Sequence, residues 1–244
     1  MALPFFYIER VDTASSFLVL NEDTSKHVAQ VLRMQTGEQL QLTDGKGNLF
    51  TAKITDNNRK KCSVEVIKTI NYQPSTISIT IAISLIKNSS RFEWFLEKAT
   101  EIGVTEIIPL ICERTEKTAV KPERMKTILV NAMLQSRQCW LPVLHEPVVF
   151  NKLWQSSKAI TLAKLEEYDQ KFIAHCIDDE KRNLSDLVNS SLNSQVILIG
   201  PEGDFTKEET DLAIQHHFIP VSLGNTRLRT ETAGVVAATL LSLA

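Results

Sequence analysis

The sequence lacks the features that would assign it to a membrane or a secreted class of protein. No run of about 18 uncharged apolar residues suited to a membrane span occurs in its 244 residues outside 71–86, and that stretch is interleaved with Ser and Thr in strand-like alternation. The start, Met1-Ala2-Leu3-Pro4, runs into Glu9 and Arg10 without a basic segment ahead of an apolar one. We therefore expect no membrane span, no secretion signal and a cytoplasmic protein.

Metal-binding and disulfide patterns are also missing. The cysteines form no C-x-x-C pair, which argues against a zinc site and a disulfide framework and favours reduced, mostly buried thiols. His216 and His217 are adjacent and so point to different faces, while the other three histidines stand alone. We expect no metal. The four cysteines are Cys62, Cys112, Cys139 and Cys176.

Charge is distributed unevenly along a chain whose net charge is −2. Residues 138–219 hold seven Lys/Arg against thirteen Asp/Glu, so the positive excess lies in the first 137 residues. This excess fits either a phosphate-binding face or an ordinary solvated surface.

Residues 1 to about 70 predict a compact β-barrel with one helix. Residues 5–8 favour a short strand, and 25–32 a helix with Ser25 as its cap. The turn Asp44-Gly45-Lys46-Gly47 is expected to join 39–43 to 48–55 as a hairpin, because these residue types tolerate positive φ. Residues 62–69 predict the next strand.

A linker is expected at 71–75, where a proline stands among polar residues. Beyond it, apolar strands alternate with amphipathic helices, the pattern of an α/β fold around a parallel sheet. Gly103 marks the end of the first of these helices. The expected strands are 77–85, 107–111, 159–162, 195–199 and 219–223, and the expected helices are 89–102, 122–138, 206–217 and 230–243.

Two loops of this second region carry chemistry. The first, Gly200-Pro201-Glu202-Gly203-Asp204-Phe205, follows a strand and precedes a capping box formed by Thr206 and Glu209. Loops at the carboxyl ends of such strands bind ligands, and glycines permit close approach to a flat group such as adenine. An ordinary turn between strand and helix is the alternative.

The second loop, 223–233, places Arg227 and Arg229 at the start of a helix, where the dipole disfavours cations. A nearby anion or polar ligand would explain them, and a helix start capped by Thr230 or Thr232 is the alternative. Neither loop is a G-x-G-x-x-G fingerprint or ends in Gly-Lys-Ser/Thr, so nicotinamide and ATP enzymes are disfavoured. No Ser-His-Asp or Cys-His set is suggested by spacing.

Together, I-G-P-E-G-D-F-T-x-x-E at 199–209 and L-G-x-x-x-L-R-T-E-T-A at 223–233 resemble the small-subunit rRNA uridine N3-methyltransferases (the RsmE type) of the SPOUT superfamily. The segments around 87–93, 98–104, 135–136 and 27–33 extend the resemblance over nearly the whole chain. The resemblance implies a PUA-like amino-terminal β-barrel for RNA (1–72), a SPOUT α/β domain with a trefoil knot (73–244), and a homodimer. Knots are rare, so the knot depends on the resemblance alone.

The resemblance also implies S-adenosyl-L-methionine as cofactor and methylation of uracil N3 in 16S rRNA, at the family's target uridine 1498. Arg229, supported by Thr230, is the expected donor to the uracil oxygens, and Glu202 is expected to offset the sulfonium charge or act as a base. A salt bridge of Arg229 with Glu231 or Glu202 is the alternative. The expected cofactor residues are Leu162, Ala163, Leu198, Ile199, Gly200, Pro201, Glu202, Gly203, Ser222, Leu223, Gly224, Asn225 and Leu228. The expected RNA contacts are Arg10, Lys26, His27, Arg33, Lys87, Arg91 and Lys98.

Three positions depart from the family pattern. Lys26 stands where a second His is usual. Gln138 and Thr226 each stand where an Arg is usual, and each has an Arg next to it, Arg137 and Arg227. Two other functions stay open. One is a related knotted enzyme acting on another base or a ribose in rRNA or tRNA, and the other is a non-catalytic RNA-binding assembly factor.

Overall fold

This computed structural model describes residues 3–9, 16–154, 163–177, 181–189 and 191–243. The chain forms two compact units. Unit 1 comprises Met1–Pro74 and Met133–Leu141, and unit 2 comprises Ser75–Ala132 and Pro142–Ala244. Among the described residues, none of the helices is long and apolar enough to cross a membrane.

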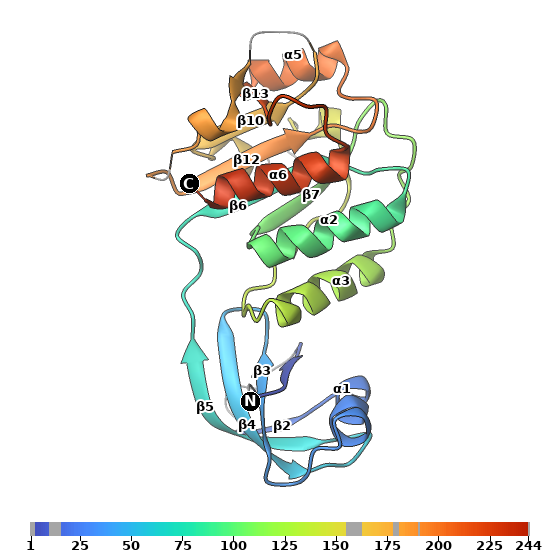
Figure 1. The fold of residues 1–244 in the computed structure, drawn as a ribbon, viewed down its shortest axis with the longest axis vertical. Coiled ribbons are helices and arrows are strands. Elements are labelled where there is room, and N and C mark those ends of the chain that lie inside the picture. Colours follow the sequence, from blue (N-terminus) through green and yellow to red (C-terminus); the bar gives the residue numbers. More distant parts are fainter. Residues whose placement is uncertain (1–2, 10–15, 155–162, 178–180, 190, 244) are drawn as a thin grey trace. The chain divides into compact units, whose positions relative to one another are not determined.

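Unit 1 contains a curled five-stranded sheet in the order β1-β3-β4-β5-β2 (Figure 1). The strands are β1 (Phe5–Tyr7), β2 (Phe17–Val19), β3 (Gln39–Thr43), β4 (Asn48–Asp56) and β5 (Ser63–Asn71). The predicted hairpin is confirmed, since β3 and β4 pair antiparallel with Leu42 opposite Phe50. Alternate residues of these strands, such as Leu40, Leu42 and Ile54, fill the core of the unit.

The helix of unit 1 begins earlier than predicted. Helix α1 (Glu22–Lys26) continues into a π-helical turn, η1 (His27–Val31). The predicted cap at Ser25 is wrong, because the Asn21 side chain accepts the Thr24 N–H at 2.8 Å and is the N-cap. Ser25 is buried; its hydroxyl donates to the Leu20 carbonyl at 3.1 Å and accepts the Cys62 N–H at 2.9 Å.

Unit 2 is built on an eight-stranded sheet in the order β11-β13-β10-β12-β6-β7-β8, with β9 paired to β7. All of these pairs are parallel. The central strands β6 and β12 are buried almost throughout, as their apolar sequences predict for strands covered on both faces. The strands are β6 (Ser78–Ser84), β7 (Glu106–Ile111), β8 (Val143–Leu144), β9 (Val148–Val149), β10 (Gln170–Ala174), β11 (Arg182–Asn183), β12 (Ser194–Ile199) and β13 (Ile219–Ser222).

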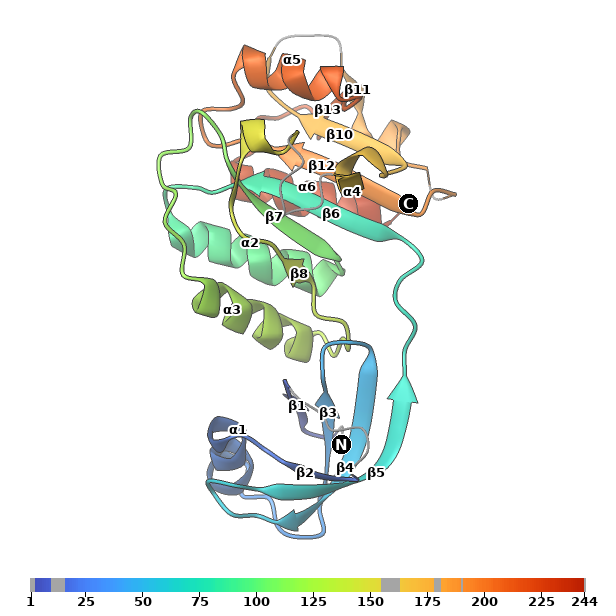
Figure 2. The ribbon, with the colours of Figure 1, turned by 180° about the vertical axis from the view of Figure 1, so that it is seen from behind.

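Helices α2 (Ser89–Ile102) and α6 (Thr230–Ser242) lie side by side over one face of this sheet (Figures 1 and 2). Their approach requires Gly234, since a Cβ there would lie 2.6 Å from the Phe95 ring. Helix α2 has the predicted bounds and ends at Gly103, which adopts φ 99°. The remaining helices are α3 (Pro122–Gln135), α4 (Ala163–Glu166) and α5 (Lys207–Gln215).

Three predicted elements of unit 2 differ from the structure. Helix α5 ends at Gln215 and not at 217, because His217 takes the left-handed φ of 66°. Helix α3 ends at Gln135 and not at 138, because Arg137 takes the left-handed φ of 57° and the Gln138 N–H turns back to the Met133 carbonyl at 2.9 Å. The predicted strand 159–162 lies outside the described residues, and β10, which sequence reasoning missed, lies between β12 and β13. The predicted α/β class is confirmed by a parallel carboxy-terminal sheet and by a curled five-stranded sheet where an amino-terminal β-barrel was predicted, while the knot stays a prediction.

Candidate functional site

The carboxyl ends of the neighbouring parallel strands β10, β12 and β13 surround two adjoining cavities of about 420 and 340 Å³. Both predicted loops reach this place: 199–204 lines the first cavity, and 221–228 lines the second and part of the first. Ligands of open α/β sheets bind at such strand ends. The cavities share Ala174, Cys176, Arg227, Leu228 and Ala233, so they form one continuous site.

The first cavity is rich in charge of both signs. Its walls carry three arginines and three carboxylates beside apolar groups such as Ile199 and Leu228. This composition suits a ligand that itself bears separate positive and negative groups. The charged residues are Arg91, Arg227, Arg229, Glu202, Asp204 and Glu231.

The second cavity is lined mainly by the loop after β13. Gly224 adopts φ 135°, and a Cβ added to it would meet no atom within 4 Å, so its backbone conformation is what requires glycine there. The Ser222 hydroxyl donates to the Gly224 carbonyl at 2.8 Å and accepts its N–H at 3.2 Å. Opposite this loop, the Lys181 ammonium donates to the carbonyls of His175 at 2.8 Å and Ile177 at 2.5 Å. Side chains thus fix the backbone on two sides of the cavity.

Three side chains fasten the loop 200–205 to the loops after other strands. The Glu202 Oε1 accepts the N–H of Lys87, in the loop after β6, at 3.0 Å. The Asp204 Oδ2 accepts the N–H of Cys176, in the loop after β10, at 2.7 Å. From the loop after β7, the Arg114 Nη1 donates to the Gly203 carbonyl at 2.7 Å. The loop is therefore preorganised by its neighbours.

The predicted capping box at the start of α5 is confirmed. The Thr206 side chain accepts the Glu209 N–H at 3.2 Å, and the Glu209 Oε2 accepts the Thr206 N–H at 3.0 Å. Glu209 is buried, and its Oε1 also accepts the Glu113 N–H at 2.8 Å. One carboxylate therefore joins the end of the glycine loop to the segment after β7.

The glycines of this loop have a packing reason of their own. A Cβ on Gly200 would lie 3.1 Å from the Phe205 N, and one on Gly203 would lie 3.2 Å from the Arg114 Cδ. Both contacts are tighter than ordinary van der Waals distances. Gly200 therefore lets the loop fold back on Phe205, and Gly203 lets the Arg114 side chain pack against the loop.

The predicted catalytic residues Arg229, Thr230 and Glu202 all line the first cavity. Arg229 is exposed and is the N-cap residue of α6, without a side-chain cap bond, so neither Thr230 nor Thr232 is the cap. Thr230 is buried at the first position of the helix. Glu231 pairs with Arg91 and not, as the alternative had it, with Arg229. Within the described chain Glu231 is buried, and its Oε1 lies 3.6 Å from the Arg91 Nε.

Most predicted cofactor residues lie at the two cavities. Four of them are not among the residues that line the cavities. Leu198 is buried within β12, Gly203 belongs to the loop after β12, Ala163 begins α4, and Leu162 lies outside the described residues. The third wall is formed by 174–176, which sequence reasoning missed because β10 was not recognised. Those lining the cavities are Ile199, Gly200, Pro201, Glu202, Ser222, Leu223, Gly224, Asn225 and Leu228.

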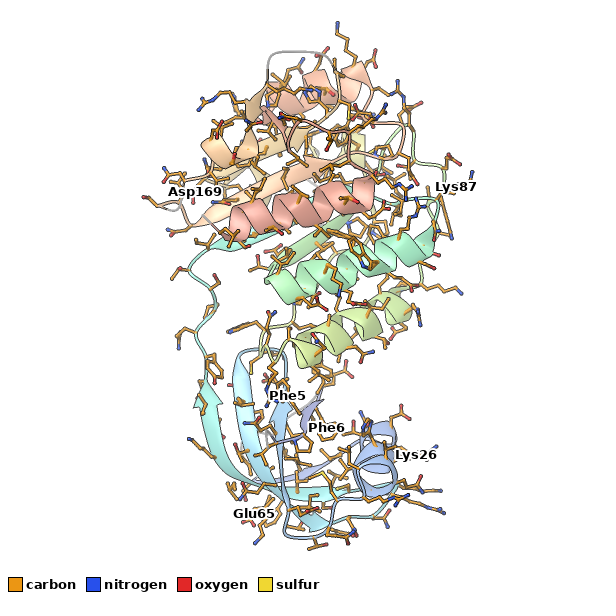
Figure 3. All side chains as sticks on the ribbon, viewed as in Figure 1. Phe5, Phe6, Lys26, Glu65, Lys87 and Asp169 are labelled. Carbon is orange, nitrogen blue, oxygen red and sulfur yellow. The ribbon has the colours of Figure 1, made fainter. Side chains whose placement is uncertain are left out.

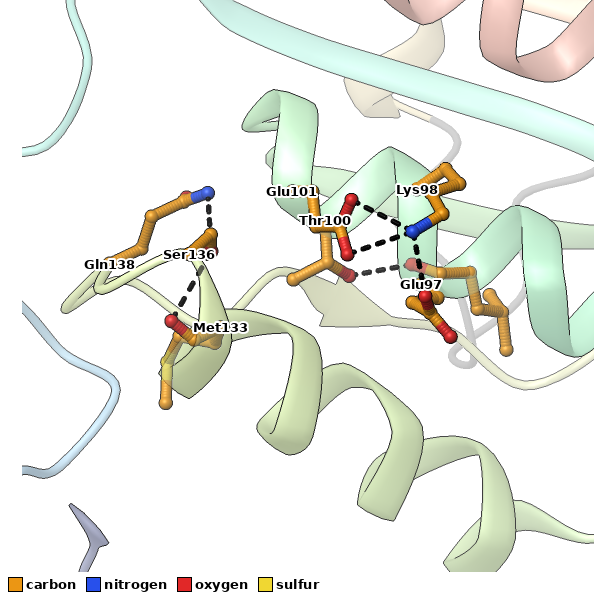
Figure 4. Close-up of polar contacts among 8 residues, drawn as sticks. Glu97, Lys98, Thr100, Glu101, Met133, Ser136 and Gln138 are labelled. Atoms are coloured by element: carbon orange, nitrogen blue, oxygen red, sulfur yellow. Dashed lines mark hydrogen bonds and ion pairs between the residues drawn. The ribbon is translucent and has the colours of Figure 1, made fainter. Parts of the chain in front are cut away.

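The three cations of unit 2 that were predicted to bind RNA each face a carboxylate. The Nζ of Lys87, a residue labelled in Figure 3 just before the start of α2, lies 2.7 Å from the Glu116 carboxylate, and Arg91 faces Glu231. The Lys98 ammonium bridges the carboxylates of Glu97 at 2.7 Å and Glu101 at 3.0 Å (Figure 4). The hydrogen bonds that the Lys98 ammonium donates to Glu97 and Glu101 hold the pKa of Lys98 above its usual value.

The predicted RNA contacts of unit 1 are differently placed. Lys26, His27 and Arg33 are exposed, and Arg33 adopts φ 54°. The His27 ring meets the Phe6 ring edge-on at 5.7 Å. Arg10 lies outside the described residues. Arg137, one place before the departure at Gln138, donates to the Gln41 Oε1 at 2.8 Å within this unit.

The thiols have no metal-binding arrangement in the part of the chain that the structure describes, where no three His, Cys, Asp or Glu residues are grouped to hold an ion. All four cysteines are free, and three are buried. Burial raises the pKa of Cys62 to about 11 and that of Cys112 further. Cys176 is exposed at the cavities.

Comparisons with known proteins agree with this geometry. The family described as "RNA methyltransferase domain" matches residues 73–242, and "RNA methyltransferase PUA domain" matches 20–67. The chain is 33% identical, over 86% of its length and 68% of the relative's, to "Ribosomal RNA small subunit methyltransferase E" of Synechocystis sp..

Two crystal structures share the fold over nearly the whole of both chains. A probable rRNA-methyltransferase from Porphyromonas gingivalis is 37% identical with a TM-score of 0.85, covering 97% of this chain and 95% of its own. A ribosomal RNA small subunit methyltransferase E from Neisseria gonorrhoeae, bound to S-adenosyl methionine, is 28% identical with a TM-score of 0.84, covering 99% and 98%.

Proposed function

Because the chain belongs to the RNA methyltransferase family, we propose that it methylates N3 of a uridine in 16S rRNA of the small ribosomal subunit, using S-adenosyl-L-methionine. The observation that supports this most is the meeting of the two glycine loops at one site with Arg229 on its wall. Relatives named for small-subunit rRNA methylation support the choice of RNA.

The site fits this cofactor. Its cavities lie within the range of about 300–1,000 Å³ typical of small-molecule sites, and they combine apolar walls with fixed backbone groups. When bound, S-adenosylmethionine supplies an electrophilic methyl group on a positively charged sulfur. The loops 199–203 and 222–228 would hold it, with Ala174 and Cys176 as the third wall.

Arg229 and Thr230 are the proposed donors to the nucleotide. As uracil N3 loses its proton and attacks, negative charge spreads to the two carbonyl oxygens beside it, and preorganised donors stabilise that charge. The Arg229 guanidinium can donate to two acceptors at once, and it is exposed at the cavity with no ion pair among the described residues. The Thr230 hydroxyl supports it from the buried first turn of α6.

Glu202 is the proposed carboxylate partner of the reaction. Its Oε1 is bound to the Lys87 N–H, so its other oxygen is the one available to offset positive charge or to take the N3 proton. The same bond gives Glu202 a second role, because it fixes the loop. We therefore expect Glu202→Gln to keep most cofactor affinity while methyl transfer falls.

One assay tests the reaction. Labelled methyl donor is incubated with the protein and with small subunits, naked 16S rRNA or tRNA, and reverse-transcription stops are mapped, because an N3 methyl blocks base pairing. Label on tRNA, or label without a stop, would favour a related enzyme acting on another base or a ribose. Calorimetry showing no cofactor binding would favour an inert assembly factor. Sedimentation tests the homodimer.

A further inference from the structure

The turn between β4 and β5 concentrates positive charge on unit 1. It contains three consecutive cations, Arg59, Lys60 and Lys61, all exposed. None of them was singled out by the resemblance or by the spacing of motifs. We call this segment, residues 57–62, the basic turn.

Side chains of the turn hold its backbone in one conformation. The Asn58 Oδ1 accepts the N–H groups of Lys60 at 2.9 Å and Lys61 at 3.3 Å. The Asp56 Oδ1 accepts the Asn58 N–H at 3.1 Å. The cations therefore project from a defined turn, which lowers the entropy lost when they bind a partner.

The basic turn is joined to two other cationic segments. The Asn57 Nδ2 donates to the Met34 carbonyl at 3.2 Å, next to Arg33, and the Cys62 N–H donates to the Ser25 hydroxyl at 2.9 Å, next to Lys26. Both views place the turn beside α1 (Figures 1 and 2). Cations from three segments of the chain are thus gathered at one end of the unit.

These five cations have no ion pair among the described residues, whereas Lys87, Arg91, Lys98 and Arg124 of unit 2 each have one. Beside them, Val31 and Leu32 are 65% and 43% exposed and add a small apolar area. The cations outnumber the carboxylates of these segments, which are Asp56, with its Oδ1 bound to the Asn58 backbone, and Glu22 and Asp23 in the first turn of α1. A dense positive surface with a small apolar area matches the phosphates and sugars of a nucleic acid.

We infer that the basic turn, with Lys26 and Arg33, binds the phosphate backbone of the RNA substrate. This inference rests on the proposed function and gives it a docking surface distinct from the methyl-transfer site. Phosphate contacts position an RNA without reading its sequence, and each one releases counterions, so binding through this surface is salt-dependent.

The test compares two matched double variants of the full chain. Lys60→Ala with Lys61→Ala removes two charges from the basic turn, and Lys53→Ala with Lys68→Ala removes two exposed charges from the middle of β4 and β5. Affinity for in vitro transcribed 16S rRNA is measured over a salt series. We expect the turn variant to lose about 3- to 10-fold in affinity at low salt and about 1 to 2 in the slope of log K against log salt.

Equal losses in both variants, or a loss that does not depend on salt, would overturn the inference. So would weaker binding to intact small subunits with unchanged binding to the naked transcript, since that would indicate an acidic ribosomal protein as the partner. Cofactor binding and thermal unfolding of each variant exclude misfolding. Wild-type protein that binds the transcript through the turn but transfers no methyl group would refute the proposed reaction and leave the surface in place.

Discussion

Two sets of cations, one in each unit, are used in opposite ways. In unit 2, Lys87, Arg91, Lys98 and Arg124 each face a carboxylate, and Arg114 and Lys181 donate to backbone carbonyls around the site. In unit 1, the cations of α1, the Arg33 turn and the basic turn have no such partners among the described residues. These six cations of unit 2 therefore bind groups of the protein itself, while the named cations of unit 1, like Arg229 at the site, are available to a partner.

This difference separates two kinds of effect that substitutions can have. An exposed ion pair adds only about 0–1 kcal/mol to stability, but it neutralises a cation locally. A cation that fixes a loop affects the affinity for the ligand that the loop binds. An unpaired exposed cation instead attracts an anionic partner over a longer range, and that attraction weakens as salt is added. Changes in unit 2 are expected to alter cofactor binding or methyl transfer, and changes in unit 1 to alter RNA affinity.

The largest effect is expected from Arg229→Ala. Removal of a preorganised donor to developing negative charge typically costs about 100- to 1,000-fold in rate, while a side chain exposed at the cavity contributes little to holding the cofactor. We expect methyl transfer to fall by about 100-fold or more, and cofactor affinity to change by less than about 3-fold. Labelled-methyl incorporation and calorimetry measure the two quantities.

Arg229→Lys is the informative companion, because it keeps the charge but loses the two-pronged donor. We expect it to recover only a small part of the activity. Loss of cofactor binding together with activity, or full activity in Arg229→Ala, would contradict the assigned role.

Arg114→Ala is expected to show the reverse pattern. Its guanidinium holds the Gly203 carbonyl, so its loss loosens the loop and weakens cofactor binding by about 10-fold, the value of one charge-assisted hydrogen bond partly exposed to water. Methyl transfer at saturating cofactor is expected to change much less. Arg124→Ala, which removes an exposed pair with Glu93, is the matched control with no expected effect. A fall in the saturated rate with unchanged affinity would refute positioning by Arg114.

The sequence predicts this site where local patterns determine local structure. Helix α2 has the predicted bounds because its apolar face repeats with helical spacing and Gly103 stops it, and the capping box of α5 requires only Thr206 and Glu209. The two loops meet because parallel strands end at one edge of a sheet, and that followed from the predicted α/β class.

What was missed depends on contacts distant in sequence. Strand β10 is five residues long and begins with Gln170 and Lys171, so its pattern does not separate it from a loop, and the wall at Ala174 and Cys176 was missed with it. The partner of Glu231 is Arg91, 140 residues earlier in the chain, whereas the alternative that the sequence offers is Arg229, two residues away. The knot is a property of the whole chain path, and no local pattern predicts it.

A smaller effect is expected when the same change is made in both units. Arg33→Ala removes an unpaired cation of unit 1 and is expected to weaken binding of the 16S transcript by about 3-fold and lower the salt slope by about 1. Lys98→Ala removes a cation already bridging Glu97 and Glu101, and is expected to change affinity by less than about 2-fold, since its charge is locally neutralised. Filter binding at several salt concentrations measures both. Equal effects would remove the distinction between the units.

The smallest effect concerns a carboxylate that unit 2 uses for its own fold. The Oδ2 of Asp169, a residue labelled in Figure 3, accepts hydrogen bonds from the Ser194 hydroxyl and from the N–H groups of Asn193 and Ser194, all at 2.9 Å. These bonds lower the pKa of Asp169 below its ordinary value of 3.8. A carboxylate whose pKa is lower in the folded state than in the unfolded state stabilises the fold at any pH above its unfolded-state pKa. This stabilisation is lost as the pH falls through its folded-state pKa. Asp169→Asn is therefore expected to lower the Tm slightly at pH 7, with a difference from wild type that shrinks as pH falls below 3.8. The Tm is measured by calorimetric scans between pH 3 and 7, with Asp211→Asn, an exposed change on α5, as the control. If the difference in Tm between Asp169→Asn and wild type were constant with pH, the charge of Asp169 would not stabilise the fold.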